Sequence, residues 1–257
     1  MPLGIYPCYN IVMRIKDYLL QLNNLRKIFG FQLIGQALKF DLKQEIMADI
    51  PAKRLLVLAP HPDDDVLGCG GVIALNQLKG GQTIIVYFSN KKNAVRKHEA
   101  EDSAKILGAE TRFWDVSEDE VDGKVPKLMD ELISRFDPDV ILSPGLTDPH
   151  PDHYDTASLL AQILEKSNFP GEIWQYCVWQ PVYANRLVTI DKVIEQKKKA
   201  VKAHSSQLSD RPYLEAILGL NTYRAKMFAA GEYCEAFLAT NSKIYLKLFE
   251  LTKLKIN

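Results

Sequence analysis

Cysteine pairs, an excess of charge of one sign and long apolar runs are all missing from this chain. Its four cysteines, Cys8, Cys69, Cys177 and Cys234, are scattered and form no CxxC pair. This spacing argues against a cysteine-built zinc site or a disulfide framework and is typical of reduced thiols in the cytoplasm. No run of about eighteen apolar residues occurs, and the N-terminus lacks the features of a signal peptide. We therefore expect a cytoplasmic protein without a membrane-spanning helix.

The charges of the sequence balance, with 32 Lys and Arg against 32 Asp and Glu among 257 residues. Without a basic field we expect no nucleic-acid partner. Two short basic runs, Lys91-Lys92 and Lys197–Lys199, are expected to be solvated faces of helices or loops. Apolar residues make up 47% of the chain and charged residues 25%, which is typical of a globular protein, and the length suits one large α/β domain.

From residue 53 onward, short apolar or β-branched runs alternate with segments of helical character. The predicted strands are Leu55–Ala59, Thr83–Phe88, Thr111–Trp114, Val140–Ser143, Ile173–Trp179 and Leu187–Ile190. The predicted helices are Val66–Leu78, Ala94–Leu107, Val125–Phe136, Tyr154–Glu165 and Ile194–His204, followed by Pro212–Ala229 and Ser242–Leu254 with a strand or extended piece at Tyr233–Leu238. This order predicts an α/β fold, with a Rossmann-like, mainly parallel sheet flanked by helices.

The first fifty residues differ from the rest. Apolar positions within Ile11–Phe40 recur every three or four residues, which indicates one or two amphipathic helices broken near Gly30. We therefore predict a helical extension over residues 1–50 and one domain over residues 51–257. The extension either packs on the core or on another subunit of a homo-oligomer, or makes a peripheral membrane contact through residues 11–40.

The segment Pro60–Asp65, which reads Pro-His-Pro-Asp-Asp-Asp, directly follows the first predicted strand. Imidazole and carboxylate are usual ligands of a borderline divalent metal, and ligands in open α/β sheets bind beyond the carboxyl ends of strands. The two prolines stiffen the turn and aim its side chains. We predict His61 and Asp64 as metal ligands and Asp63, lying beside the metal, as a general base.

The alternative for this segment is a turn whose aspartates cap the helix predicted from Val66. Three adjacent carboxylates repel one another unless a cation neutralises them, which favours the metal. The glycines that follow, Gly68, Gly70 and Gly71, do not complete a dinucleotide fingerprint because residue 73 is Ile. We expect them instead to allow close packing of helix on sheet.

The second candidate segment, His150-Pro151-Asp152-His153, also follows a predicted strand. His153 would complete a His/Asp/His metal set with room for water, which is the pattern of catalytic rather than structural sites. His150 would then serve as an acid or electrophile, and Asp152 could orient one of the rings by a hydrogen bond. The alternative is a polar loop with solvated histidines. Two segments of this kind at matching strand ends predict a metal-dependent hydrolase.

Together, the motifs at Pro60–Asp65 and His150–His153 resemble the two signature motifs of the LmbE/PIG-L family of zinc-dependent de-N-acetylases. The resemblance covers roughly residues 53–207. It implies a Rossmann-like fold, Zn²⁺ as the cofactor and removal of an acetyl group from an N-acetylglucosaminyl compound. It implies that His61, Asp64 and His153 bind zinc, that Asp63 is the general base and that His150 stabilises the oxyanion.

Two shorter matches add to this resemblance. Arg96 with Glu99 resembles an R-x-x-E element whose arginine contacts substrate, and the segment His204–Gln207 resembles an H-x-S-Q element near the site. The resemblance therefore implies Arg96 and His204 as substrate-binding residues. The chain departs from the family where the first motif usually ends in Asp-Asp-Glu, because Asp65 stands in place of the glutamate.

Several alternatives stay open at the level of sequence. Iron or cobalt would suit the same ligands as zinc, and the scissile bond could be another amide or an ester. A catalytically idle binding relative is a further alternative, although it would not need a complete set of ligands and base. The substrate could be a free or a lipid-linked N-acetyl sugar, a glycan intermediate or a low-molecular-weight thiol precursor. The amphipathic N-terminal segment mildly favours the lipid-linked sugar.

Overall fold

The structure is a computed structural model that describes residues 43–89, 93–114 and 124–253. Its elements are β1 (Glu45–Met47), β2 (Arg54–Ala59), α2 (Asp64–Leu78), β3 (Gln82–Tyr87), α3 (Ala94–Leu107), β4 (Glu110–Phe113), α4 (Lys124–Phe136), β5 (Val140–Pro144), α5 (Pro151–Leu164), β6 (Glu172–Tyr176), β7 (Arg186–Thr189), the 3₁₀ turn η2 (Asp191–Val193), α6 (Ile194–Ala203), α7 (Ser205–Leu208), α8 (Tyr213–Met227), β8 (Cys234–Asn241) and α9 (Ser242–Thr252).

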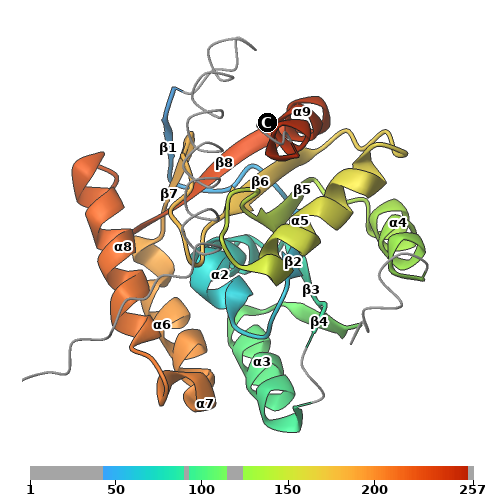
Figure 1. The fold of residues 1–257 in the computed structure, drawn as a ribbon. Helices are drawn as coiled ribbons and strands as arrows, with labels where there is room; N and C mark the ends of the chain where they lie inside the picture. Colours follow the sequence, from blue (N-terminus) through green and yellow to red (C-terminus); the bar gives the residue numbers. More distant parts are fainter. Residues whose placement is uncertain (1–42, 90–92, 115–123, 254–257) are drawn as a thin grey trace, which may run out of the picture.

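The strands form one mixed sheet in the order β1-β7-β8-β6-β5-β2-β3-β4 (Figure 1). All described neighbours pair in parallel except β8, which runs antiparallel to both β6 and β7. The chain moves from β2 to β3 and β4 on one side, and then crosses to β5 and β6 on the other. The predicted α/β fold with a mainly parallel sheet is confirmed, and the direction of strand order reverses between β2 and β5.

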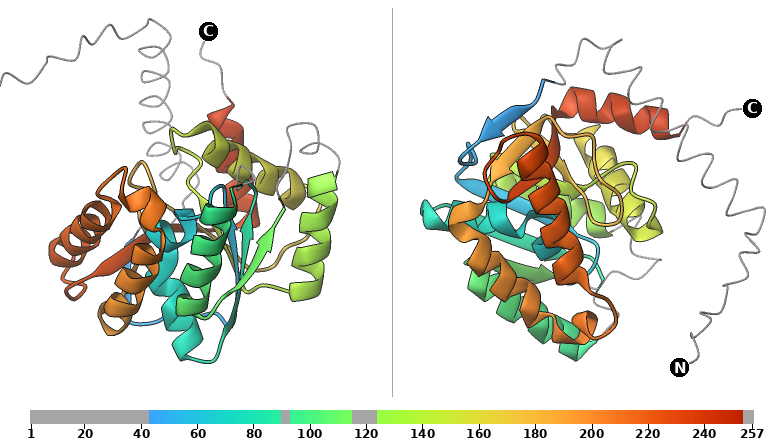
Figure 2. Two further views of the ribbon diagram at one scale, coloured as in Figure 1. Left: turned by 90° about the horizontal axis from the view of Figure 1, so that it is seen from below. Right: turned by 90° about the vertical axis from the view of Figure 1, so that its left-hand side faces the viewer.

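Alternating strand residues supply two separate cores, one on each face of the sheet. In β2, Leu55 and Val57 face the core formed with α2, α3, α6 and α8, whereas Leu56 and Leu58 face the core formed with α4, α5 and α9. Figures 1 and 2 show these helix groups on opposite sides of the sheet. Burial of both faces explains why the central strands are continuous apolar runs in the sequence.

Part of the predicted N-terminal extension belongs to the sheet. Strand β1 lies within residues 1–50 and pairs in parallel with β7, with Ile46 opposite Leu187. The amphipathic segment Ile11–Phe40 and the basic pair Lys91-Lys92 lie outside the described residues, so the helices and membrane contact predicted for residues 11–40 stay predictions. Within the described residues, no helix is both long enough and apolar enough to cross a membrane.

Helix α2 packs closely against the sheet at two of the glycines that follow the first motif, as expected. A Cβ added at Gly68 would overlap the ring of Tyr176 in β6. A Cβ added at Gly71 would lie 2.6 Å from Cγ2 of Ile190, a fully buried residue. The absence of a side chain at these positions therefore sets how closely the helix that follows the first motif approaches the strands.

We expect Gly71→Ala to lower the free energy of unfolding by about 1–3 kcal/mol, because the branched side chain of buried Ile190 has no room to move. Gly219→Ala is the matched control, since an added Cβ in α8 meets nothing within 4 Å and the residue is exposed. That control should raise stability by up to about 1 kcal/mol through helix propensity. Urea unfolding of the three proteins measures both effects, and equal stability of Gly71→Ala and wild type would contradict the close contact.

Candidate metal centre and its cleft

The two predicted motifs meet at the carboxyl ends of β2 and β5, where the strand order reverses. Ligands of open α/β sheets bind at such a switch point because the loops diverge there and leave a crevice. His61 and Asp64 come from the β2–α2 junction, and His153 comes from the first turn of α5. A cleft opens there, lined by both motifs and by residues from α3, α7, α8 and the segment after β6.

The turn between β2 and α2 has a strained backbone at its centre. Asp63 is the N-cap of α2 with φ 122° and ψ −28°, a conformation that side chains other than glycine rarely adopt. Its side chain makes no capping hydrogen bond to the helix. The carboxylate of Asp64 turns back and accepts a hydrogen bond from the backbone N–H of His61 at 2.9 Å. The aspartates therefore do not serve as the helix caps of the alternative interpretation.

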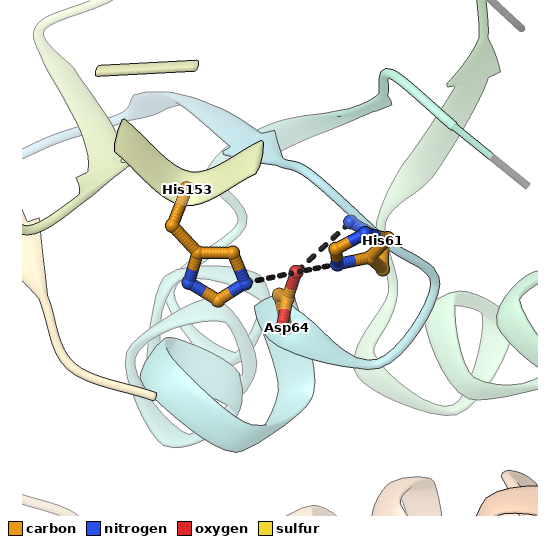
Figure 3. Close-up of side chains that lie close together, drawn as sticks. All are labelled: His61, Asp64 and His153. Carbon is orange, nitrogen blue, oxygen red and sulfur yellow. Dashed lines mark hydrogen bonds and ion pairs between the residues drawn. The ribbon is translucent and has the colours of Figure 1, made fainter. Parts of the chain in front are cut away.

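His61, Asp64 and His153 bring their ligand atoms within 4.8 Å of one another, and all three residues are buried. Asp64 Oδ2 lies 3.2 Å from His61 Nδ1 and 3.2 Å from His153 Nε2. Figure 3 shows the carboxylate between the two imidazoles. Both ring nitrogens of His153 are buried without a hydrogen bond of normal geometry to any described residue. Two imidazoles and a carboxylate suit a divalent transition metal, and the unsatisfied ring nitrogens of His153 supply a free donor atom.

Two further carboxylates lie behind the histidines of this group. Asp148 Oδ2 is 3.3 Å from Nδ1 of His153, and Asp148 Oδ1 accepts a hydrogen bond from the backbone N–H of His150. Asp152 Oδ2 is 2.7 Å from Nε2 of His61. A carboxylate on the far nitrogen of a ligand imidazole fixes its orientation and tautomer. Asp152, predicted to orient one of the rings, thus contacts His61, whereas sequence reasoning missed Asp148.

His150 lies beside this group as the N-cap of α5, with its ring centroid 4.9 Å from that of His153. Its Nδ1 accepts a hydrogen bond from the backbone N–H of Asp152. The proton of a neutral His150 ring is consequently on Nε2, which makes that nitrogen a donor. Burial, together with His153 and His61, lowers the pKa of His150, so the ring is neutral at physiological pH.

In this group the carboxylates raise the pKa of the imidazole that they contact, and the imidazoles lower the pKa of the carboxylate between them. Although burial opposes charge on its ring, contacts with Asp148 and Asp64 raise the pKa of His153 to about 10. Although burial alone would raise it, His153 and His61 hold the pKa of Asp64 well below its usual range. Burial and the neighbouring Asp64 raise the pKa of Asp63 to about 8, against the attraction of Arg96.

The two shorter motifs of the sequence contact each other next to the cleft. Arg96 donates through Nη2 to the carbonyl of Pro62 at 2.8 Å and to Oδ1 of Asp63 at 3.2 Å. One turn later, Glu99 accepts hydrogen bonds from the hydroxyls of Ser205 and Ser206 and from the Ser206 backbone N–H. Helix α3 therefore connects the strained turn of the first motif to the start of α7.

Of the two predicted substrate-binding residues, only Arg96 lies at the cleft. Arg96 borders the cleft, whereas His204, which precedes α7, is only 2% exposed and is absent from the cleft lining. The lining contains Gln207 of α7 instead. Sequence reasoning also missed Trp179, which follows β6, and Tyr213 at the start of α8, both in the lining. Nothing in the local sequence marks these two, because only the fold brings their elements to the cleft.

Asp65, the departure from the family motif, is fully buried in α2. Neither of its carboxylate oxygens has a hydrogen-bond partner among the described residues. Burial raises the pKa of Asp65 to about 7, against the influence of the Tyr87 hydroxyl. The shorter side chain therefore points into the interior, and it is not among the ligand atoms grouped at His61, Asp64 and His153.

Comparison with known proteins agrees with this geometry. A family model described as PIG-L, GlcNAc-PI de-N-acetylase, matches residues 56–164. The diacetylchitobiose deacetylase of Thermococcus kodakarensis is 27% identical in an alignment that covers 77% of this chain and 86% of that protein. The 4-oxalmesaconate hydratase of Pseudomonas putida is 26% identical in an alignment that covers 61% of this chain and 75% of that protein.

A solved structure shows the same fold. The N,N′-diacetylchitobiose deacetylase of Pyrococcus horikoshii, determined with an inhibitor, superposes with a TM-score of 0.65 at 25% sequence identity. The match covers 85% of this chain and 94% of that chain. The resemblance predicted from the two motifs is confirmed.

Asp148→Asn should lower the affinity for Zn²⁺ roughly 10- to 100-fold, because it removes the negative charge behind the His153 imidazole. Titration of the metal-free protein against a competing chelator measures this affinity. Asp102→Asn is the control, since Asp102 pairs with His98 on the exposed side of α3. Unchanged affinity of Asp148→Asn would show that Asp148 does not support a ligand.

Burial lowers the pKa of His204 to about 4, compared with 6.5 in an unfolded chain. The unfolded chain therefore takes up a proton on this residue as the pH falls below 6.5, whereas the folded chain does not until about pH 4. Stability that is present at pH 7 should decrease on acidification, by about 2 kcal/mol between pH 7 and pH 5 from this residue alone.

His204→Leu removes this contribution and should reduce the loss of stability between pH 7 and pH 5 relative to wild type. His98→Gln, at an exposed histidine of α3, should keep the wild-type pH dependence. Urea unfolding at both pH values gives the comparison, and parallel pH profiles of wild type and His204→Leu would contradict a buried neutral imidazole.

Proposed function

We propose, since residues 56–164 match the PIG-L family model, that this protein is a metal-dependent hydrolase that removes an acetyl group from an N-acetylglucosamine-type conjugate. The diacetylchitobiose deacetylases that it resembles support an N-acetyl sugar as the substrate class. The observation that carries the proposal is that one cleft is lined by Asp63 and by two members of the candidate metal group, His61 and Asp64.

His61, Asp64 and His153 would hold the metal, with zinc as the preferred ion for two imidazoles and one carboxylate. When bound, such an ion supplies Lewis-acid polarisation of a carbonyl group and lowers the pKa of water to about 7. Three protein ligands leave a coordination position free, as a catalytic site requires. Asp148 and Asp152 would fix the rings of His153 and His61 from behind.

Asp63 is the proposed general base. It takes a proton from the attacking water as the bond between that oxygen and the acetyl carbon forms. It returns the proton to the sugar nitrogen as the carbon–nitrogen bond breaks, so acetate and a free amine leave. A residue that both accepts and donates a proton works best when its pKa is near the working pH. Arg96 holds the Asp63 carboxylate in place and lowers its pKa, as a cation on Asp64 would.

His150 is the proposed donor to the developing oxyanion. With Nδ1 accepting from the backbone N–H of Asp152, its Nε2–H is available to an acceptor. A neutral ring is sufficient for this role, because the N–H rather than a net charge forms the hydrogen bond. Such a donor typically contributes about 2.7–4 kcal/mol to the stability of the transition state.

The cleft supports a small polar substrate with a ring. Trp179 is 43% exposed on one wall, its ring lies parallel to that of His150, and Gln207 and Tyr213 supply polar atoms. An amphipathic sugar face fits such a wall of one indole and several polar groups.

A second candidate function is hydration of a carbon–carbon double bond in an acidic small molecule. The resemblance to the 4-oxalmesaconate hydratase of Pseudomonas putida favours it. The same base would deprotonate water in both reactions, so the cleft residues rather than the metal group distinguish them. Incubation with 4-oxalmesaconate, followed by mass spectrometry for a gain of water, tests this candidate directly.

The deacetylase proposal is tested by acetate release from N,N′-diacetylchitobiose and other N-acetylglucosamine conjugates in the presence of Zn²⁺. We expect Asp63→Asn to lower kcat about 10²- to 10⁴-fold through loss of proton transfer. His150→Ala should lower kcat about 10²- to 10³-fold, with the metal content of the protein unchanged.

His98→Ala is the control for the histidine substitution, because His98 is an exposed residue of α3 outside the cleft. Near-wild-type rates for Asp63→Asn and His150→Ala with metal bound would refute the assigned roles. Hydration of 4-oxalmesaconate without acetate release from any conjugate would favour the second candidate.

A further inference from the structure

Helix α2 is not a regular helix. Its backbone departs from helical geometry at Cys69, with φ −145° and ψ 18°, which produces a kink five residues after Asp64. Kinks have local causes such as proline, glycine or a group inserted into the hydrogen-bond ladder. The short N-terminal part of the helix, which carries the metal-ligand candidate, is thus oriented separately from the rest.

A buried ion pair from two other elements lies at this kink. The Nζ atom of Lys197 in α6 lies 2.5 Å from Oε1 of Glu235 in β8, and the side chains are 0% and 1% exposed. The expectation that Lys197 lies on a solvated face of a helix or loop is therefore wrong. Lys198 and Lys199 do reach the surface, but the helical period turns Lys197 toward the sheet.

The ion pair bonds backbone groups that belong to two steps of the helix ladder. In a regular helix the N–H of Gly71 would donate to the carbonyl of Leu67. Here the Gly71 N–H donates to Glu235 Oε1 at 2.7 Å, and the Leu67 carbonyl accepts from Lys197 Nζ at 3.1 Å. The N–H of Val72, which would reach Gly68, donates to Glu235 Oε2 at 2.8 Å.

Stability alone does not account for such a pair. Removing two charges from water costs hydration free energy, and their mutual attraction does little more than offset that cost. An apolar pair of similar volume therefore often gives the same stability. What an apolar pair lacks is the ability to bond separated N–H and carbonyl groups. The feature specific to Lys197 and Glu235 is therefore that they hold α2 in its kinked form.

We propose that Lys197 and Glu235 are a positioning pair that orients the first turn of α2 and so places Asp64 between His61 and His153. This inference rests on the metal site of the proposed function. Arg96 holds the upstream end of the same short segment through the Pro62 carbonyl, and the ion pair holds its downstream end at Leu67. Neither member of the pair borders the cleft, so both act through Asp64.

The test uses metal binding by the full chain, with Zn²⁺ affinity measured by chelator competition and site geometry by the visible absorption of bound Co²⁺. Lys197→Met and Glu235→Gln should each lower Zn²⁺ affinity roughly 10- to 100-fold and alter the Co²⁺ spectrum. With an N-acetyl sugar substrate, kcat should fall while KM stays within about twofold, because no cleft contact is lost.

Lys198→Met is the matched control, because Lys198 is the next residue of α6 and pairs with Glu195 at the surface. It should leave affinity, spectrum and kcat unchanged. Glu235→Asp is a milder variant that keeps the charge but loses the reach to both N–H groups, and it should weaken Zn²⁺ binding in the same direction. Wild-type affinity and spectrum in folded Lys197→Met, Glu235→Gln and Glu235→Asp, whatever their stability, would overturn the proposal.

Wild-type protein provides a test that needs no variant to fold. Because coupling between two sites is reciprocal, binding of Zn²⁺ should slow hydrogen exchange of the Gly71 and Val72 amides. Unchanged exchange on saturation with Zn²⁺, or no binding of Zn²⁺ at all, would overturn the positioning role. Metal binding with this response but without acetate release would refute the deacetylase activity and leave the positioning pair supported.

Discussion

The buried carboxylate of Asp64 is the group on which the arrangement of the cleft depends. It lies between the imidazoles of His61 and His153 and accepts a hydrogen bond from the backbone of His61. A carboxylate in this environment needs positive charge around it, supplied either by protons on the imidazoles or by a cation. The neighbouring carboxylates Asp148 and Asp152 add negative charge, so the whole group favours the binding of protons or of a cation.

The backbone is irregular on both sides of Asp64. Immediately before it, Asp63 has a positive φ, a conformation that costs about 1–3 kcal/mol and persists only when its surroundings hold it. Five residues after it, Cys69 breaks the helix. Arg96 forms a hydrogen bond to the backbone of the first irregular stretch, and the Lys197–Glu235 pair forms hydrogen bonds to the backbone of the second. Long-range contacts thus maintain both distortions that direct Asp64 into the cleft.

Features encoded by neighbouring residues were predicted well. The boundaries of α3 agree because Asn93 caps the helix through its side chain and Gly108 ends it with φ 73°. The central parallel strands agree because their apolar runs are buried on both faces. Features that depend on distant residues were not predicted. These include the antiparallel insertion of β8 between β6 and β7, the burial of Lys197 and the place of Asp148 behind His153.

The α/β class, the two histidine–aspartate motifs and their placement after strands follow from the sequence alone, because hydrophobic period and residue chemistry are local properties. The pairing of β2 with β5 at the reversal of strand order, which brings His153 to Asp64, depends instead on the folded arrangement of the whole sheet. The tertiary structure also decided that Gln207 rather than His204 borders the cleft, because the turn entering α7 directs one side chain outward and buries the other. Side-chain direction depends on packing between distant elements, which no local pattern records.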